Sequence, residues 1–426
     1  MADAVNANLF GRAFERGRLE RLADWLVVAV AVTLPWSTSA TWVCLVLWVL
    51  ALIPTLSVAS VRREAWSFAG GLPVLLWALA IIGLAWGQVS FAERLAGVGG
   101  YNKLVIIPLL LTQFRRSERA LLVLYGFLAS CVLLLIVSWL LQILWIIVPE
   151  KELYVQGKLP GVPVKDYIAQ STEFLVCAFA LLAIAFERMR ARHVAFAAGL
   201  VLLALLFLAN IFYVSAGRTA LVVIPILLAI LGFREFGWKG TIGACAAGAI
   251  LIAAAWASSP MLRDRVLDSI EDVISYRSDN TVSSASLRLA FWKQSLTFIS
   301  EAPVIGHGTG TMPNLFRDAA ATATGPAAVA SVNPHNQYFA VAIELGVVGL
   351  AILIAMWIAH LALFRGPGLV AWFGLVIVLQ NVISSLFNSH LFDFFHGWFY
   401  VFGVGVLGGM ALRRLAPPAG ATLEAR

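Results

Sequence analysis

Basic residues at the ends of apolar runs are the side chains best placed to do chemistry in this sequence. Arg218 follows the tripeptide Ser-Ala-Gly (215–217) and opens an apolar run over 218–233. An arginine beside a glycine at a helix start suits phosphate oxygens, because guanidinium and backbone N–H groups can both point at the anion. The alternative is an arginine that lies along the membrane surface and keeps its charged head in water.

Two more candidates lie in or beside the only long polar stretch, residues 259–336. Arg288 lies in SLRLAFW (286–292), and His335 lies in NPHNQY (333–338), where the stretch meets the next apolar run. An unperturbed histidine has a pKa of about 6.5, which makes His335 a natural general base near neutrality. The plainer alternatives are a solvated arginine on an amphipathic helix and an interfacial histidine that only forms hydrogen bonds.

Other polar groups are weaker candidates. His307 lies in GHGTG (306–310), which we interpret as a turn whose backbone amides could help to bind a ligand, because it follows no strand. Lys103 follows Arg94 at the end of an apolar segment and is a further candidate for binding a pyrophosphate.

In the run 388–396, His390 and His396 lie on opposite sides of Asp393. Together they could bind a metal, but the spacing is unspecific, and we predict neither a metal site nor a cofactor. Glu344 lies inside an apolar run, where an unpaired carboxylate is costly, so we expect it to bind an arginine or a backbone donor.

The elements that must position these residues are membrane helices. The chain has 426 residues, of which 61% are hydrophobic and 12% charged, whereas soluble domains carry about 25% charged residues. This composition excludes an ordinary soluble enzyme. The first 21 residues are polar and no cleavage site follows the first apolar run, so that run should remain as a spanning helix. The four cysteines lie in apolar runs without paired spacing, which predicts neither disulfides nor zinc binding.

We therefore predict an all-α, polytopic integral membrane protein with about twelve transmembrane helices and a large helical periplasmic loop. The predicted segments are 22–36, 39–56, 71–87, 104–114, 119–148, 171–186, 194–214, 218–233, 240–258, 337–364, 368–388 and 397–412. The segment 104–114 is short, so it either extends back through 91–101 or is re-entrant.

The distribution of positive charge sets the expected orientation. Every second connection is basic, and the basic connections should be cytoplasmic. They contain Arg12, Arg16, Arg18, Arg21, Arg62, Arg63, Arg115, Arg116, Arg119, Arg188, Arg190, Arg192, Arg234, Lys239, Arg365, Arg413 and Arg414. Both termini should then be cytoplasmic. We expect an N-terminal bundle over 1–258, a periplasmic loop over 259–336, C-terminal helices over 337–412 and a cytoplasmic tail over 413–426.

Within the loop, apolar spacing predicts two helices, over 261–276 and 284–299. The second should bury a stripe made of Leu287, Phe291 and Leu296. The Ala/Thr/Gly-rich residues 319–332 are interpreted as a loop.

The order of the motifs resembles the O-antigen ligase/polymerase superfamily. The motifs are Ser215-x-Gly217-Arg218, then Arg288-x-x-x-Trp292, then PVIGHG (303–308), His335-Asn336-x-Tyr338 and ELGVVGL (344–350). The resemblance covers about residues 200–360. It implies glycan transfer from an undecaprenyl pyrophosphate carrier at the periplasmic face of the bacterial inner membrane, in lipopolysaccharide biosynthesis.

The resemblance also implies residue roles. Arg218 and Arg288 would bind the donor pyrophosphate and His335 would act at the acceptor hydroxyl, with Lys103, Arg94, His307 and Tyr338 as further substrate-binding candidates. An O-antigen ligase would pass the glycan to lipid A–core oligosaccharide in a metal-independent, inverting transfer. The alternatives are an O-antigen polymerase of the same superfamily and, in a different class, a transporter or flippase of lipid-linked glycans. No nucleic-acid partner is expected.

Overall fold

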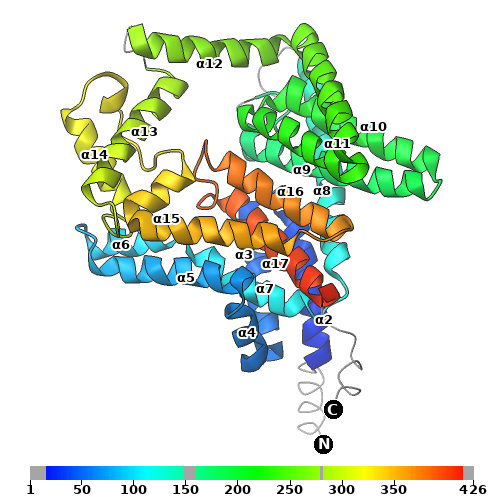
Figure 1. The fold of residues 1–426 in the computed structure, drawn as a ribbon, viewed down its shortest axis with the longest axis horizontal. Coiled ribbons are helices and arrows are strands. Elements are labelled where there is room, and N and C mark those ends of the chain that lie inside the picture. The colour runs from blue at the N-terminus through cyan, green and yellow to red at the C-terminus, as the bar shows by residue number, and fades with distance from the viewer. Residues whose placement is uncertain (1–15, 148–158, 279–281, 416–426) are drawn as a thin grey trace, which may run out of the picture.

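The computed structural model describes residues 16–147, 159–278 and 282–415, and within these ranges every regular element is helical (Figure 1). A helix satisfies its own backbone hydrogen bonds, which is what an apolar chain needs inside a lipid bilayer. The predicted tail 413–426 lies outside the described residues beyond position 415, as does Arg12.

The helices of the bundle follow one another closely along the chain. They are α2 (Arg16–Thr33), α3 (Thr38–Leu52), α4 (Val58–Ala65), α5 (Phe68–Ile82), α6 (Phe91–Val98), α7 (Ile106–Phe114), α8 (Ala120–Ile147), α9 (Tyr167–Arg190), α10 (Val194–Asn210), α11 (Arg218–Ser258), α15 (Gln337–Leu363), α16 (Leu369–Ser384) and α17 (Phe394–Leu415). Short helical turns join several of them, namely the 3₁₀ turns η1 (Ile53–Thr55), η2 (Gly83–Ala85) and η3 (Asn102–Val105) and the π-helix η4 (Ile211–Ser215).

Eight helices in the described residues are long and apolar enough to cross a membrane, and a bent pair over 91–114 adds a ninth. The protein is therefore a polytopic membrane protein, and the short segment 104–114 extends back through α6 across a bend of 44°. The expected number of about twelve is higher because it also counted three weaker segments. These are α2, whose first turns are charged, α16, which has 16 residues, and the second half of α11.

The 41 residues of α11 fold back on themselves. Gly237 has φ +66° and ψ −153°, which breaks the helix, and a Cβ on Gly232 or Gly240 would overlap the other residue's carbonyl oxygen. An uninterrupted helix of this length would be about 60 Å long, twice the hydrocarbon thickness of a bilayer. The two glycines instead let the predicted segments 218–233 and 240–258 pack closely as a hairpin.

The polar stretch 259–336 forms α12 (Pro260–Ser278), α13 (Ser284–Glu301), α14 (Met312–Thr322) and the short turn η5 (Gly325–Ala328), and α12 and α13 confirm the two predicted helices. Figure 1 shows α13 and α14 beside α6 and one end of α15. Phe291 is buried, but the predicted stripe is wrong at Leu296, which is 57% exposed, because Phe298 packs inward instead. The loop predicted over 319–332 is helical in part, because α14 runs to Thr322 and η5 covers Gly325–Ala328.

Helix α9 lies at the centre of the bundle, since 83% of its span is buried inside the protein. The polar side chains near its start, Gln170, Ser171, Thr172 and Glu173, are buried and therefore face other helices and not lipid. This placement matters for the site, because the first turns of α9 contact several of the residues described next.

Candidate active site

Arg218 is positioned by a tight turn that lies on the first turns of α9. The π-helix η4 ends at Ser215, and Ala216 then adopts the left-handed conformation with φ +42°. A Cβ on Gly217 would overlap Ser171 Oγ, and Ser171 Oγ donates to Ser215 Oγ at 2.9 Å. The glycine is thus required for close approach to α9, and Arg218 becomes the first residue of α11.

Arg288 lies on α13, across from this turn. Both arginines are partly buried. The pKa of Arg288 is lowered mainly by burial and next by the positive charge of Arg218, while Tyr167 at the start of α9 raises it. The two arginines are therefore close enough for the charge of Arg218 to act on Arg288.

His335 lies in a turn with a strained backbone. It is not a glycine but has φ +50°, and Asn333 Oδ1 accepts a hydrogen bond from its backbone N–H at 2.8 Å. Its ring stacks on Phe291, with the centroids 6.2 Å apart, and its Nδ1 lies 3.1 Å from Asn388 Oδ1. Such strain is usual at functional sites. Among the described residues, Nε2 of His335 has no hydrogen-bond partner.

Helix α13 connects the arginines to the histidine. Arg288 and Phe291 are three residues apart and so lie on the same side of the helix. Phe291 stacks on His335, and Trp292 Nε1 donates to the carbonyl of Pro334 at 3.1 Å. A single helix thus carries one arginine next to Arg218 and holds the turn that presents His335.

The turn itself is bound to the connection between α16 and α17. Gln337 N donates to the carbonyl of Ser385 at 2.8 Å, and Asn336 Nδ2 donates to that of Leu386 at 3.1 Å. Asn336 also caps α15 by accepting from two backbone N–H groups. We call residues 333–337 together with 388–393 the histidine turn.

The PVIGHG and ELGVVGL motifs meet in a second structure, which we call the glycine clasp (303–310 with 343–348). Backbone N–H groups of His307 and Gly308 donate to the carbonyls of Ile343 and Glu344 at 2.8 and 2.9 Å. Helix α15 breaks at Gly346, with φ +62°, and a Cβ there would overlap the carbonyl of Val304. Close contact with backbone atoms therefore explains Gly306, Gly308 and Gly346.

Glu344 is bound inside the clasp. Its carboxylate accepts from Gly310 N at 3.0 Å and from Tyr101 Oη at 3.0 Å. The expected backbone donor is thus confirmed, and no arginine among the described residues binds this carboxylate. Buried and doubly bonded, Glu344 holds the clasp on the bundle.

The four further substrate-binding candidates all bind main-chain carbonyls. Lys103 Nζ donates to the carbonyls of Phe392 and Asp393 at 3.0 and 2.8 Å. His307 Nε2 lies 2.8 Å from the carbonyl of Phe298, Arg94 Nη1 donates to that of Leu84 at 2.6 Å, and Tyr338 Oη donates to that of Val382 at 3.0 Å. These bonds give each of the four side chains a main-chain partner within the protein.

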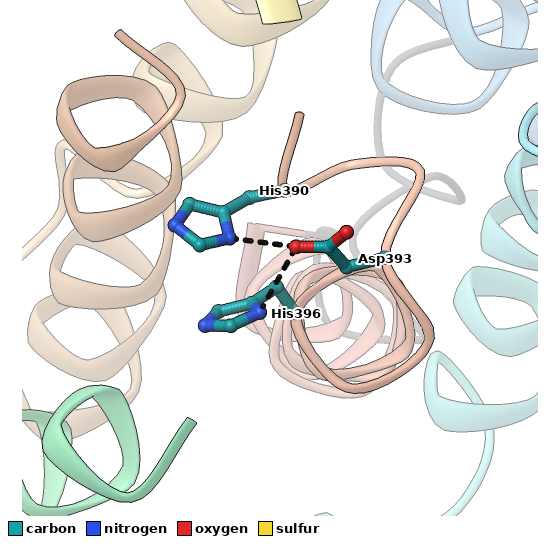
Figure 2. A group of neighbouring side chains, drawn as sticks. All are labelled: His390, Asp393 and His396. Atoms are coloured by element: carbon teal, nitrogen blue, oxygen red, sulfur yellow. Dashed lines mark hydrogen bonds and ion pairs between the residues drawn. The ribbon is translucent and has the colours of Figure 1, made fainter. Parts of the chain in front are cut away.

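Figure 2 shows His390, Asp393 and His396 gathered around one carboxylate oxygen. Nδ1 of His390 and Nδ1 of His396 lie 3.1 and 3.5 Å from Asp393 Oδ2. Two imidazoles and a carboxylate are ligands that Zn²⁺ accepts, and no other such group of three occurs among the described residues. Hydrogen bonds from the two imidazoles to the carboxylate account for the same geometry.

Burial governs the charges of this cluster. It lowers the pKa of His390 to about 4, with His396 adding to the effect. Burial by itself would raise the pKa of Asp393, but the bonds from His390 and His396 outweigh it and hold that pKa below its usual range. His390 is therefore neutral and Asp393 ionised at neutral pH.

Some contacting residues escaped the sequence analysis. Tyr167 acts on Arg288, Asn388 binds His335, and Thr172 Oγ1 lies 3.3 Å from His396 Nε2. The density of polar residues in FNSHLFDFFH (387–396), inside an otherwise apolar region, was the signal for Asn388. Tyr167 and Thr172 gave no such signal, because only packing brings the start of α9 to the site.

Residues 174–354 match a family model described as O-antigen ligase (Wzy_C), a range that contains Arg218, Arg288, His335 and the glycine clasp. No curated protein matches the chain.

Proposed function

Since residues 174–354 match the O-antigen ligase family model, we propose that the protein is an O-antigen ligase. It transfers a glycan from undecaprenyl pyrophosphate to lipid A–core oligosaccharide at the periplasmic face of the bacterial inner membrane, with both termini in the cytoplasm. The observation that carries this proposal is the arrangement around α13, which holds Arg288 beside Arg218 and packs on His335.

On the donor side, Arg218 and Arg288 bind the pyrophosphate. As the bond from the anomeric carbon to the phosphate oxygen breaks, negative charge grows on the leaving pyrophosphate. Two guanidinium groups already held together neutralise this charge without rearranging, which is the usual source of electrostatic catalysis.

On the acceptor side, His335 acts as the general base. Its Nε2 takes the proton of the acceptor hydroxyl, the hydroxyl oxygen forms the new bond to the anomeric carbon, and the pyrophosphate leaves with the bonding electrons. A single displacement of this kind inverts the anomeric centre. A positioned base contributes roughly 10²–10⁴ in rate. Arginines supply the charge that a metal would otherwise supply, so we propose that the transfer is metal-independent.

The alternatives differ in the acceptor or in the class of activity. A polymerase of the same family would use the same donor and leave a longer glycan on the carrier lipid. One observation in the structure favours a transporter. Glu173 is buried in α9, and neither carboxylate oxygen has a hydrogen-bond partner among the described residues. Charged groups within spans are typical of transport pathways.

One reconstituted assay separates these functions. Purified protein is mixed with an undecaprenyl-pyrophosphate glycan and lipid A–core, with and without EDTA, and the products are resolved by gel and mass. We expect glycan on lipid A–core at equal rates in both conditions, and a fall of at least about a hundredfold for His335→Ala. Longer glycan on the carrier would identify a polymerase.

Two other outcomes contradict parts of the proposal. Transfer that is lost in EDTA and restored by Zn²⁺ would rule out the metal-independent mechanism and direct attention to His390, Asp393 and His396. No product at all, combined with movement of the lipid-linked glycan across proteoliposomes, would replace the enzyme with a transporter.

A further inference from the structure

Asn388 contacts both the candidate base and the buried carboxylate behind it. Its Oδ1 lies 3.1 Å from His335 Nδ1, and its Nδ2 donates to Asp393 Oδ2 at 3.4 Å. The amide thus stands between the ring that would take the acceptor proton and the cluster drawn in Figure 2. Neither the sequence motifs nor the family match includes this residue.

The orientation of this amide is fixed by the backbone. Oxygen and nitrogen of an asparagine are normally assigned from their hydrogen-bond partners. Ser389 N lies 3.0 Å from Asn388 Oδ1, and a backbone N–H can only donate. The atom that faces both Ser389 N and His335 Nδ1 must therefore be the oxygen, and the Nδ2 group turns toward the Asp393 carboxylate, as the structure has it.

An oxygen facing Nδ1 decides where the proton of His335 lies. A neutral imidazole has one N–H donor and one acceptor nitrogen, and an amide oxygen can only accept. With the proton on Nδ1 the contact is a hydrogen bond, whereas with the proton on Nε2 two acceptors would face each other. The loss of one hydrogen bond biases the two tautomers by roughly tenfold. Free imidazole side chains prefer the opposite tautomer in water.

We propose that Asn388 is a positioning residue that holds the proton of His335 on Nδ1 and so keeps the Nε2 lone pair available for the acceptor hydroxyl. The consequence for transfer rests on the proposed role of His335 as general base. The partner of one ring nitrogen sets the state of the other, which is how second residues orient catalytic histidines.

Neighbouring side chains hold Asn388 and His335 in this arrangement. Lys103 Nζ binds the carbonyls of Phe392 and Asp393, which fixes the turn that carries the carboxylate. His390 donates to the same carboxylate oxygen that Asn388 Nδ2 contacts. On the other side, Phe291 stacks on the His335 ring and limits its rotation. Lys103 and the cluster of His390, Asp393 and His396 thus support the position of Asn388 indirectly.

Two variants of Asn388 separate a tautomer effect from loss of packing. Asn388→Leu keeps the size but has no acceptor, and Asn388→Gln keeps both the acceptor for Nδ1–H and the donor for the Asp393 carboxylate on a longer side chain. We expect kcat to fall on the order of a hundredfold in Asn388→Leu with both KM values unchanged, and to return within about fivefold of native in Asn388→Gln. Equal losses in both variants, or full activity in Asn388→Leu, would overturn the inference.

The tautomer can be read without any activity. In protein labelled with ¹⁵N-histidine, solid-state NMR distinguishes protonated from unprotonated ring nitrogens, and the His335 signals are assigned by their loss in His335→Gln. We expect Nδ1–H in the native protein and a substantial Nε2–H population in Asn388→Leu. A native His335 with its proton on Nε2, or an unchanged tautomer in Asn388→Leu, contradicts the inference.

The kinetic and NMR measurements test the role of Asn388 separately from the proposed role of His335 as general base. A tautomer that shifts as expected while transfer stays at the native rate supports the assignment and overturns His335 as the base. Asn314→Leu is the matched control, because this partly buried asparagine also donates from Nδ2 to a carboxylate, Glu93 Oε1 at 3.2 Å, but lies on α14. It should leave the His335 signals and kcat unchanged, and a loss equal to that of Asn388→Leu would contradict a specific role for Asn388.

Discussion

The glycine clasp and the histidine turn both contain a histidine from a sequence motif, yet the two histidines are used differently. In the clasp, His307 Nε2 lies on the carbonyl of Phe298 and Glu344 binds Gly310 and Tyr101. In the histidine turn, His335 has a strained backbone and a ring nitrogen without a partner among the described residues. The Nδ1 atom of His307 also has no partner among the described residues, so the two histidines differ in backbone strain and in the element that binds each ring, which is α13 for His307 and the connection between α16 and α17 for His335.

Substitution of an arginine of the pair should have the largest effect on glycan transfer. Arg288→Ala should lower glycan transfer by about 10²–10³, because one of the two charges that stabilise the leaving pyrophosphate is lost. The measurement is the initial rate on lipid A–core, beside a thermal unfolding curve that should not change. Arg263→Ala is the control, since this arginine of the same loop binds the carbonyls of Trp256 and Ala257. Equal rate losses in both variants would refute a specific role for Arg288.

A substitution in the clasp should act on stability instead. Gly346 has φ +62° and ψ −162°, a region open essentially to glycine alone, and an added Cβ would overlap Val304. Gly346→Ala should therefore destabilise the protein by more than about 2 kcal/mol, while the rate per folded molecule stays near native. Folded yield and thermal midpoint are the measurements. Gly366→Ala, with no atom within 4 Å of the added Cβ, should change neither.

The cluster of His390, Asp393 and His396 should make the stability of the protein depend on pH. The pKa of His390 is about 4 in the folded protein and about 6.5 when unfolded, so the unfolded chain binds more protons between these values. Stability should thus be complete above about pH 6.5 and fall by at most about 3 kcal/mol as the pH drops to 4. Thermal unfolding between pH 4 and 7 measures this, and His390→Gln should flatten the curve. An equally steep curve in that variant would contradict the assignment.

The smallest expected effect is on His307. His307→Leu removes a hydrogen bond to the carbonyl of Phe298, which should cost about 1 kcal/mol of stability and change the transfer rate less than about twofold. The comparison is with His335→Ala in the same assay. A loss of transfer comparable to that of His335→Ala would mean that the clasp also contacts substrate, and the distinction between the two regions would fail.

The sequence by itself determined the membrane class, the positions of the helices and the order of the motifs. Apolar runs of bilayer length leave the backbone little choice but helix, and an arginine or histidine at the end of such a run is visible without coordinates. For the same reason α12 and α13 could be predicted from the spacing of their apolar residues. The glycines of the clasp could be recognised as a motif but not explained.

Only the tertiary structure decided which polar groups are left for chemistry. His307 and His335 look alike in the sequence. In the structure the carbonyl of Phe298 binds the ring of His307, whereas Asn388, 53 positions along the chain, orients the ring of His335. Long-range packing creates these contacts, and no local pattern encodes them. Whether a side chain is bonded or free depends on such partners, so the division between supporting and catalytic residues exists only in the folded protein.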